Sequence, residues 1–281
     1  MSGRVADEAT AAEHGFDTPK PPTLVVAVRD GRVVVTAADV TTTTVHLSGP
    51  RADEVRVEQR GDRIVVIGPK PRGLAGATDV DYEIRAPLDS ELVAHSASAT
   101  IASVGRLGAA RVKASSGEIV LDDLSGAGVV STGSASITVG EVAAGLRVRT
   151  GSGRVTVGAA TQAAVSTGSG DVRVGRLVGR LVVKSGSGDL EVDDAEGEIA
   201  FTTGSGDIVV RRSRGGRITS KGASGDVRIG VADGVAVWTD IAAHIGRISS
   251  TLPRMGEPER GAPYVEIRAI TATGHVVLGP A

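Results

Sequence analysis

The chain has 281 residues and a formal net charge of −2, and aromatic side chains make up only 2% of it. Its 31 basic and 33 acidic residues are spread along the sequence, so we predict no basic surface for nucleic acid. Cysteine is absent, which excludes disulfide bonds and thiolate metal sites. The core must therefore be built from Val, Ile, Leu and Ala.

Residues 1–20 are polar and have no hydrophobic periodicity, which predicts a flexible tail. They also lack the basic start and apolar segment of a secretory signal. No run in the chain approaches the roughly 18 apolar residues that a membrane span requires. We therefore expect a cytoplasmic protein without a membrane span.

Residues 21–95 are expected to form a block of short antiparallel strands. The apolar run 24–28 is followed by the turn dipeptide Asp30-Gly31 and a second run at 33–35, which predicts a β-hairpin. A second turn is expected at Gly61-Asp62. Further strands are predicted at 41–47, 55–58, 64–67 and 82–87.

Residues 96–230 repeat a Gly-Ser-Gly-Asp-like phrase every 17 to 19 residues. Two aliphatic positions follow each phrase, separated by one mostly polar residue, which is the pattern of a half-buried strand. A second strand precedes each phrase. The repeat predicts a single-stranded β-solenoid with coils of about 18 residues, because one coil cannot bury its apolar face alone. The aliphatic pairs are Ile119/Leu121, Ile137/Val139, Val155/Val157, Val172/Val174, Leu190/Val192, Ile208/Val210 and Val227/Ile229.

Residues 231–281 depart from the repeat and are expected to form atypical coils and a cap. The three prolines in residues 252–263 predict an inserted loop. Strands at 264–268 and 274–278 should complete the final coil. Together with Trp238, this coil is expected to cover the end of the core.

The repeated Gly-Ser-Gly-Asp-(Val/Ile/Leu) units, together with the lead-in Tyr82-Glu83-Ile84-Arg85-Ala86-Pro87, resemble the DUF4097 family, which carries the label "putative adhesin". The resemblance extends over about residues 16–279 and is closest to a cytoplasmic, actinobacterial-like branch. It implies a β-solenoid domain and no catalytic residues. It names no biochemical role.

Each repeat carries one residue immediately before its aliphatic pair, and in four copies this residue is Asp. Calcium prefers six to eight oxygen ligands, whereas this arrangement supplies one carboxylate per coil, so we favour a structural role at the turn over calcium binding. A Thr or Ser four residues earlier in five of the copies should form a ladder of hydroxyl groups. The acidic positions are Asp171, Asp189, Asp207 and Asp226, and the hydroxyl positions are Thr132, Thr150, Thr167, Ser185 and Thr203.

An enzyme would require a converging set of catalytic groups. Paired carboxylates at Asp122-Asp123 and at Asp193-Asp194 with Glu191 resemble those of glycosidases, but charged side chains on a solvated strand are far commoner. The repeat also has only one aromatic residue, Phe201. The histidines have no metal-ligand spacing; they are His14, His46, His95, His244 and His275. We therefore predict no catalytic, cofactor or metal residue.

One column of outward positions alternates between basic and hydroxyl residues. It contains Lys113, Ser131, Arg149, Ser166, Lys184, Thr202 and Lys221, and is either a modest basic stripe or a charge pattern that keeps a flat sheet soluble. We predict a non-catalytic binding or scaffolding module that uses a repetitive flat surface, with a protein partner or self-association. The alternatives are a surface adhesin exported by a non-classical route and, third, a carbohydrate-active enzyme.

Overall fold

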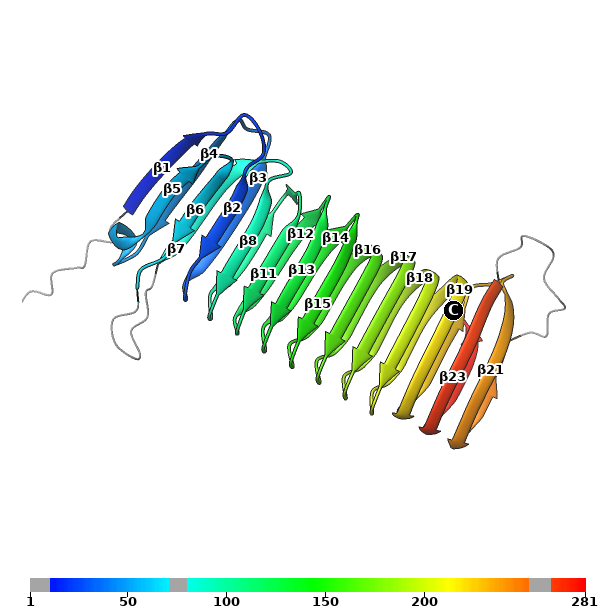
Figure 1. The fold of residues 1–281 in the computed structure, drawn as a ribbon. Coiled ribbons are helices and arrows are strands. Elements are labelled where there is room, and N and C mark those ends of the chain that lie inside the picture. The colour runs from blue at the N-terminus through cyan, green and yellow to red at the C-terminus, as the bar shows by residue number, and fades with distance from the viewer. Residues whose placement is uncertain (1–10, 71–79, 253–263) are drawn as a thin grey trace, which may run out of the picture. The chain divides into compact units, whose positions relative to one another are not determined.

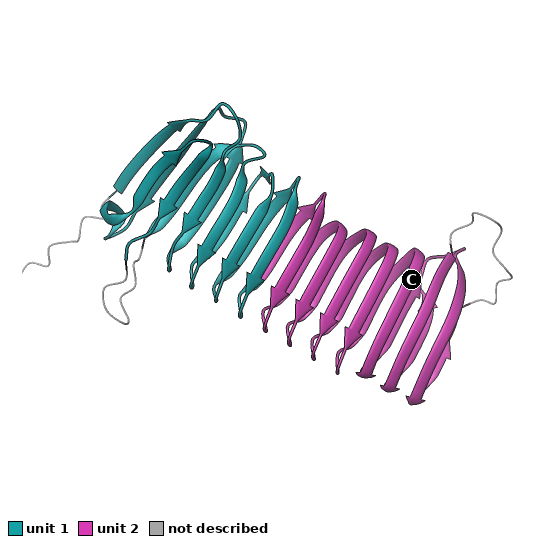
Figure 2. Ribbon diagram, viewed as in Figure 1, with its two compact units in different colours: residues 1–136 teal, residues 137–281 magenta. Residues whose placement is uncertain are grey.

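The computed structural model describes residues 11–70, 80–252 and 264–281 (Figure 1). These residues form β-strands joined by short turns, with one 3-10 turn, η1 (Ala52–Glu54), and no α-helix. The predicted all-β class is confirmed. The chain divides into two compact units, residues 1–136 and 137–281 (Figure 2), which are described separately below.

Unit 1 contains two stacks of paired strands. Stack A1 consists, in order of pairing, of β5 (Arg56–Arg60), β6 (Arg63–Ile67), β2 (Thr23–Ala27), β8 (Glu91–Ser96), β11 (Ala110–Ala114) and β13 (Ala127–Thr132). Stack B1 consists of β1 (Ala11–Asp17), β4 (Thr42–Ser48), β7 (Asp81–Pro87), β3 (Arg32–Ala38), β9 (Thr100–Val104) and β12 (Glu118–Leu124), and the short β10 (Arg106–Leu107) also pairs with β12.

The predicted antiparallel block is only partly correct. The Gly61-Asp62 turn does join an antiparallel pair, β5 and β6, but the hairpin predicted at Asp30-Gly31 is wrong. Strand β2 pairs in parallel with β6 and β8, whereas β3 pairs in parallel with β7 and β9. Each of these two strands is buried on alternate residues and is paired along both edges. The turn therefore carries the chain from one stack to the other.

The predicted flexible tail is wrong for residues 11–17. These residues form β1, which pairs antiparallel with β4. Ala12, His14 and Phe16 are half-buried while the residues between them are exposed, so a weak period-two pattern was present in a polar segment. Residues 1–10 lie outside the described residues.

Unit 2 is built from parallel strands, four of which are long and bend in the middle. Its strands are β14 (Ser136–Val142), β15 (Gly145–Thr150), β16 (Val155–Thr167), β17 (Val172–Ser185), β18 (Leu190–Thr203), β19 (Ile208–Ser224), β20 (Val227–Val231), β21 (Ala236–Ile245), β22 (Ile248–Ser250), β23 (Tyr264–Thr273) and β24 (Val276–Pro280). We call the second halves of β16–β19, with β15, β23 and β21, stack A2. The first halves, with β14, β20, β24 and β22, form stack B2.

The core of unit 2 lies between stacks A2 and B2, and the aliphatic pairs of the repeat line it. Val155 pairs with Val172, which pairs with Leu190, which pairs with Ile208. All fourteen predicted inward positions in the chain are buried, none more than 3% exposed. Stacked aliphatic side chains therefore supply the main stabilisation, through removal of their surface from water.

The order of the C-terminal strands in space differs from their order in sequence. Strand β23 lies between β19 and β21, and β24 lies between β20 and β22. Residues 236–250 therefore form the outer edge, where Ile245 is 70% and Ile248 49% exposed. The prediction that the final coil covers the end of the core is wrong, because Val265 and Ile267, both fully buried, place β23 inside the stack. The predicted inserted loop lies, from residue 253 on, outside the described residues.

One buried hydroxyl in unit 2 provides a stability test. Ser213 is fully buried, and its Oγ has no hydrogen-bond partner among the described residues. Because a buried polar group without a partner costs free energy, we expect Ser213→Ala to raise the free energy of unfolding by about 1 kcal/mol. Thermal denaturation followed by circular dichroism checks this, and a clear loss of stability would mean that the hydroxyl is bonded in solution.

Candidate binding face

The repeated acidic residues connect successive turns of the chain. The Oδ1 atom of Asp171 accepts the backbone N–H of Asp189 at 3.2 Å, and that of Asp189 accepts the N–H of Asp207 at 2.8 Å. Asp207 binds the N–H of Asp226 in the same way at 2.7 Å. One oxygen of each of these carboxylates thus satisfies a backbone donor on the neighbouring turn. This agrees with the structural role favoured from the sequence, and the bond reaches the next repeat rather than the residue's own turn.

This geometry predicts different results for two substitutions at Asp189. In Asp189→Asn the amide oxygen can still accept the N–H of Asp207, so we expect stability to change by only a few tenths of a kcal/mol. Asp189→Ala removes the acceptor and should cost about 1 kcal/mol. Urea denaturation of both variants, with and without calcium, provides the measurement. A strong calcium effect that is lost in Asp189→Asn would contradict the structural role.

The predicted ladder of hydroxyl groups has a different bonding pattern. Each hydroxyl accepts the backbone N–H three residues later in its own turn: Thr150 binds Gly153 at 3.0 Å, and Thr167 binds Gly170 at 2.8 Å. Thr132, Ser185 and Thr203 do the same. The hydroxyls therefore shape each corner locally, as Ser and Thr commonly do at turns.

The carboxylate pairs that resemble a glycosidase site are bonded to other groups. Asp122 accepts the N–H of Gly105 at 2.9 Å. Glu191 and Asp193 lie between Arg173 and Arg211, which form ion pairs with both. Arg173 and Arg211 therefore bind the carboxylates that a glycosidase would use on its substrate.

The neighbouring Asp194 predicts a measurable acid dependence. Arg214 donates two hydrogen bonds to it, at 2.8 and 2.9 Å, and these lower the pKa of Asp194 although desolvation opposes the shift. A lowered folded-state pKa stabilises the fold above the unfolded value of about 3.9, and this contribution is lost as the pH falls through the folded value.

We therefore expect Asp194→Asn to lower Tm by about 2 °C or less at pH 7, because the pair is partly exposed. The two melting curves should converge towards pH 2. Calorimetry between pH 2 and pH 7 checks this, and a constant difference across that range would mean that the carboxylate charge does not act through Arg214.

The histidines do not converge on a metal site. His46 forms an ion-pair contact with Glu13 at 3.2 Å, and His275 accepts the backbone N–H of Arg247 through Nδ1. No group of three or more His, Asp or Glu side chains that can hold a metal is present among the described residues.

The basic column is formed on the outer face of stack A2. Arg149 pairs with Ser166, Ser166 with Lys184, Lys184 with Thr202, and Thr202 with Lys221. All five side chains are exposed. Arg149, Lys184 and Lys221 form no ion pair within the described part of the chain. In unit 1, Lys113 pairs with Ser131.

Two further columns lie beside it on the same face. The nearer column contains Arg147, Ala164, Val182, Ala200, Thr219, Arg268 and Asp240, and the farther one contains Gln162, Arg180, Glu198, Arg217, Glu266 and Trp238. Between its charged ends, the nearer column consists of the smaller side chains Ala164, Val182, Ala200 and Thr219. We call these three columns together the A2 face.

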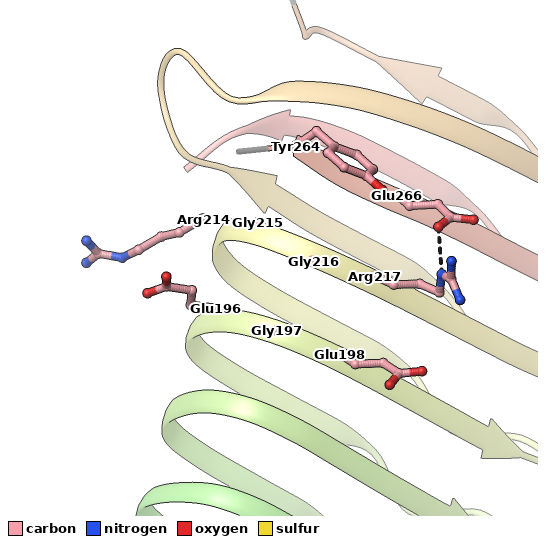
Figure 3. A pocket seen from close by; sticks show the side chains of 9 residues that line it. All are labelled: Glu196, Gly197, Glu198, Arg214, Gly215, Gly216, Arg217, Tyr264 and Glu266. Atoms are coloured by element: carbon pink, nitrogen blue, oxygen red, sulfur yellow. Dashed lines mark hydrogen bonds and ion pairs between the residues drawn. The ribbon is translucent and has the colours of Figure 1, made fainter. Parts of the chain in front are cut away.

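A shallow pocket of about 570 Å³ lies where the A2 face meets the bend of the long strands (Figure 3). Its floor includes Gly197 and Gly216, and Arg217 donates a hydrogen bond to Glu266 within it at 2.6 Å. Arg268 binds the other oxygen of Glu266 at 2.8 Å. The bond from Arg217 lowers the pKa of Glu266 against the opposing effect of desolvation. Figure 3 shows Glu196 and Arg214 extending away from this pair.

Sequence reasoning found the basic column but missed the groups at its end. Trp238 and Arg268 come from segments 30 residues apart, and they meet because β23 lies against β21, with the guanidinium 5.6 Å from the ring centroid. The expected sequential order of the final strands concealed this contact. The single tryptophan was the only signal in the sequence, and nothing near it in the sequence pointed to Arg268.

The architecture defines an all-β protein whose strands are mainly parallel and, in unit 2, pair with equivalent residues of successive repeats. The family model named Toastrack DUF4097 matches residues 23–236, and this chain belongs to that family. None of the curated proteins matches the sequence.

The chain is similar to several solved structures. A "putative adhesin" from Parabacteroides distasonis is 16% identical over 79% of this chain and 98% of its own, with a TM-score of 0.56. Two others with the same description have lower TM-scores. The one from Bacteroides fragilis is 14% identical over 96% of this chain and 97% of its own, with a TM-score of 0.44. The one from Parabacteroides merdae is 12% identical over 77% and 95%, with a TM-score of 0.42.

No helix among the described residues is long and apolar enough to cross a membrane.

Proposed function

We propose that this protein is a non-catalytic β-solenoid binding module, with coils of about 18 residues, that uses the A2 face to hold a partner. The parallel registers of unit 2 support the solenoid, since equivalent residues pair at successive repeats. A module of this kind repeats the same side-chain columns from coil to coil. It can therefore bind an extended or flat partner through many equivalent contacts.

The observation that carries this proposal is the alternation of unpaired cations with hydroxyls along an exposed column. Lys184 and Lys221 are exposed and have no acidic partner among the described residues. Elsewhere in unit 2, Arg173, Arg211, Arg214 and Arg228 are bonded to carboxylates. Cations left without internal partners are available to an external one.

Because the chain has no cysteine, a single introduced cysteine can be coupled to a bulky group that blocks one face only. Thr202 is exposed on the A2 face, and Thr138 is exposed on stack B2. Each can be changed to Cys and coupled to a bulky polyethylene glycol chain. The two conjugates should then be compared on arrays of polysaccharides, lipids and proteins.

We expect the Thr202→Cys conjugate to lose binding that the Thr138→Cys conjugate retains. Mass spectrometry of the bound ligand should show no chemical change. Equal binding by both conjugates would contradict a binding role for the A2 face. Turnover of the ligand would favour the carbohydrate-active enzyme considered from the sequence.

A scaffold that self-associates is a second candidate, favoured by the exposed edge at β21–β22. Among the described residues, β21 pairs only with β23 and β22 only with β24, so backbone groups on their other side are open to another strand. Sedimentation across protein concentration, with and without calcium, tests this candidate. Species that grow with concentration favour it, and a sharp monomer contradicts it.

The cellular location belongs to the proposal as well. We place the protein in the cytoplasm and retain a surface adhesin, exported by a non-classical route, as the alternative. Fractionation of cells that express the tagged chain separates the two.

A further inference from the structure

The edge of the A2 face combines exposed apolar and basic side chains. Trp238, Tyr264 and Ile270 are 50%, 49% and 48% exposed. Ile270 pairs with Lys221, and Arg268 lies over the ring of Trp238. Trp238 lies on β21, and Tyr264 and Ile270 lie six residues apart on the neighbouring β23, so these side chains extend along the edge. Exposed large apolar side chains gathered on one edge commonly mark an interaction site.

The charge on this face is strongly positive within the described part of unit 2. It carries seven basic side chains, Arg147, Arg149, Arg180, Lys184, Arg217, Lys221 and Arg268, and three acidic ones, Glu198, Glu266 and Asp240. Two of the three acids are already neutralised: Glu198 by Arg180, and Glu266 by Arg217 and Arg268.

The cations that remain are regularly spaced. Arg149, Lys184 and Lys221 occupy every second strand of the column. Strands lie about 4.8 Å apart, so neighbouring cations are roughly 10 Å apart. Such a flat, spaced array fits many separate anionic groups at once rather than one buried anion.

We propose that the A2 face binds an anionic lipid surface, with its basic columns over the headgroups and Trp238, Tyr264 and Ile270 at the level of the interface. This inference rests on the proposed function, because it names the partner of the same face. Tryptophan and tyrosine favour the boundary between headgroups and acyl chains. Basic residues near an anionic membrane each add to the attraction.

A soluble polyanion fits the observations less well. It would use the basic columns and leave the exposed Trp238 and Ile270 without a role. A sugar chain is commonly bound by stacking on aromatic rings, but the aromatic residues here lie at one edge of the face and not along it. A lipid surface uses both the charged and the apolar groups.

The single tryptophan makes the test direct. Purified protein is mixed with vesicles of pure phosphatidylcholine or of phosphatidylcholine with phosphatidylglycerol, and Trp238 emission and co-flotation are measured. We expect flotation and a shift of emission to shorter wavelength only with phosphatidylglycerol. Both should weaken as salt is raised, because the attraction is screened over about 8 Å at physiological ionic strength.

Matched variants locate the binding surface. Lys184→Gln with Lys221→Gln should weaken partitioning about 30-fold, at roughly fivefold for each cation. Arg176→Gln with Arg212→Gln removes the same charge from exposed positions on stack B2 and should change partitioning less than twofold. Ile270→Ser should reduce the emission shift while flotation at low salt persists. Unchanged circular dichroism spectra show that each variant is folded.

Several results would overturn the inference: absence of flotation with anionic vesicles, equal binding to neutral vesicles, or equal losses in the two charge-matched variants. Binding to polyphosphate without binding to vesicles would also overturn it. In that last case, the proposed function would still be supported if the Thr202→Cys conjugate lost the binding to polyphosphate and the Thr138→Cys conjugate kept it. If no ligand were found whose binding depends on the A2 face, or if a ligand were turned over, the proposed function itself would be wrong.

Discussion

Val192→Asp is expected to unfold the protein or leave it with no cooperative melting transition at 25 °C. Val192 is fully buried and pairs with Val174 and Val210 on the neighbouring strands. A carboxylate at this position has no partner and must be desolvated or protonated, which costs about 4 kcal/mol or more. That is a large part of the total stability of an ordinary domain. Circular dichroism and urea denaturation provide the measurement.

Val182→Asp is the matched control. Val182 lies on the same strand, β17, as Val174, but its side chain is half-buried on the outer face. The same change of residue there should cost less than about 1 kcal/mol, since the charge stays in contact with water. Equal losses in the two variants, or an unchanged melt for Val192→Asp, would contradict the stacked aliphatic core.

Gly197→Ala is expected to destabilise the protein by about 3 kcal/mol. Gly197 has a φ of +143°, and a Cβ atom there would lie 2.0 Å from the carbonyl oxygen of Gly179. Gly179, Gly197 and Gly216 pair with one another at the bend of three neighbouring strands. Alanine would therefore have to adopt an unfavourable backbone conformation and push two strands apart. Guanidinium denaturation gives the loss.

Gly145→Ala separates this local requirement from the general effect of removing a glycine. Gly145 does not have a positive φ, and the nearest atoms to an added Cβ lie at 3.9 Å. We expect this variant to be as stable as the parent, or slightly more stable because alanine restricts the unfolded chain. A similar loss in both variants would mean that close backbone approach at the bend is not what requires Gly197.

The apolar pattern was sufficient to predict the regular part of the fold. Every aliphatic pair from Ile119 to Ile229 is buried as expected, because period-two alternation determines which side chains face the core. The hydroxyl and acidic residues at the corners were placed correctly along the chain. The partners of the acidic residues were not, since their hydrogen bonds reach the next repeat and depend on how closely the turns approach.

Strand pairing in unit 1 could not be read in the same way. The Asp30-Gly31 turn predicted a change of chain direction correctly but not the partners of β2 and β3. Two buried runs separated by a turn are compatible with a hairpin and also with two separate parallel stacks. Residues distant in sequence, such as those of β6, β8 and β9, decide between these arrangements.

The candidate site likewise has one part that the sequence predicted and one part that it did not. The basic column of Arg149, Lys184 and Lys221 was visible in the sequence because residues at a fixed interval align on successive strands. Its apolar edge was not, since the insertion of β23 between β19 and β21 brings Ile270 beside Lys221 and Arg268 over Trp238.

The amino-acid sequence by itself determined the all-β class, the repeat interval and the identity of the buried side chains, because these follow from local periodicity. Only the tertiary structure decided the parallel partners in unit 1, the interior position of β23 and the composition of the A2 face. These depend on which strands meet across long stretches of chain, where the free energy of packing selects among arrangements that local patterns leave equally possible.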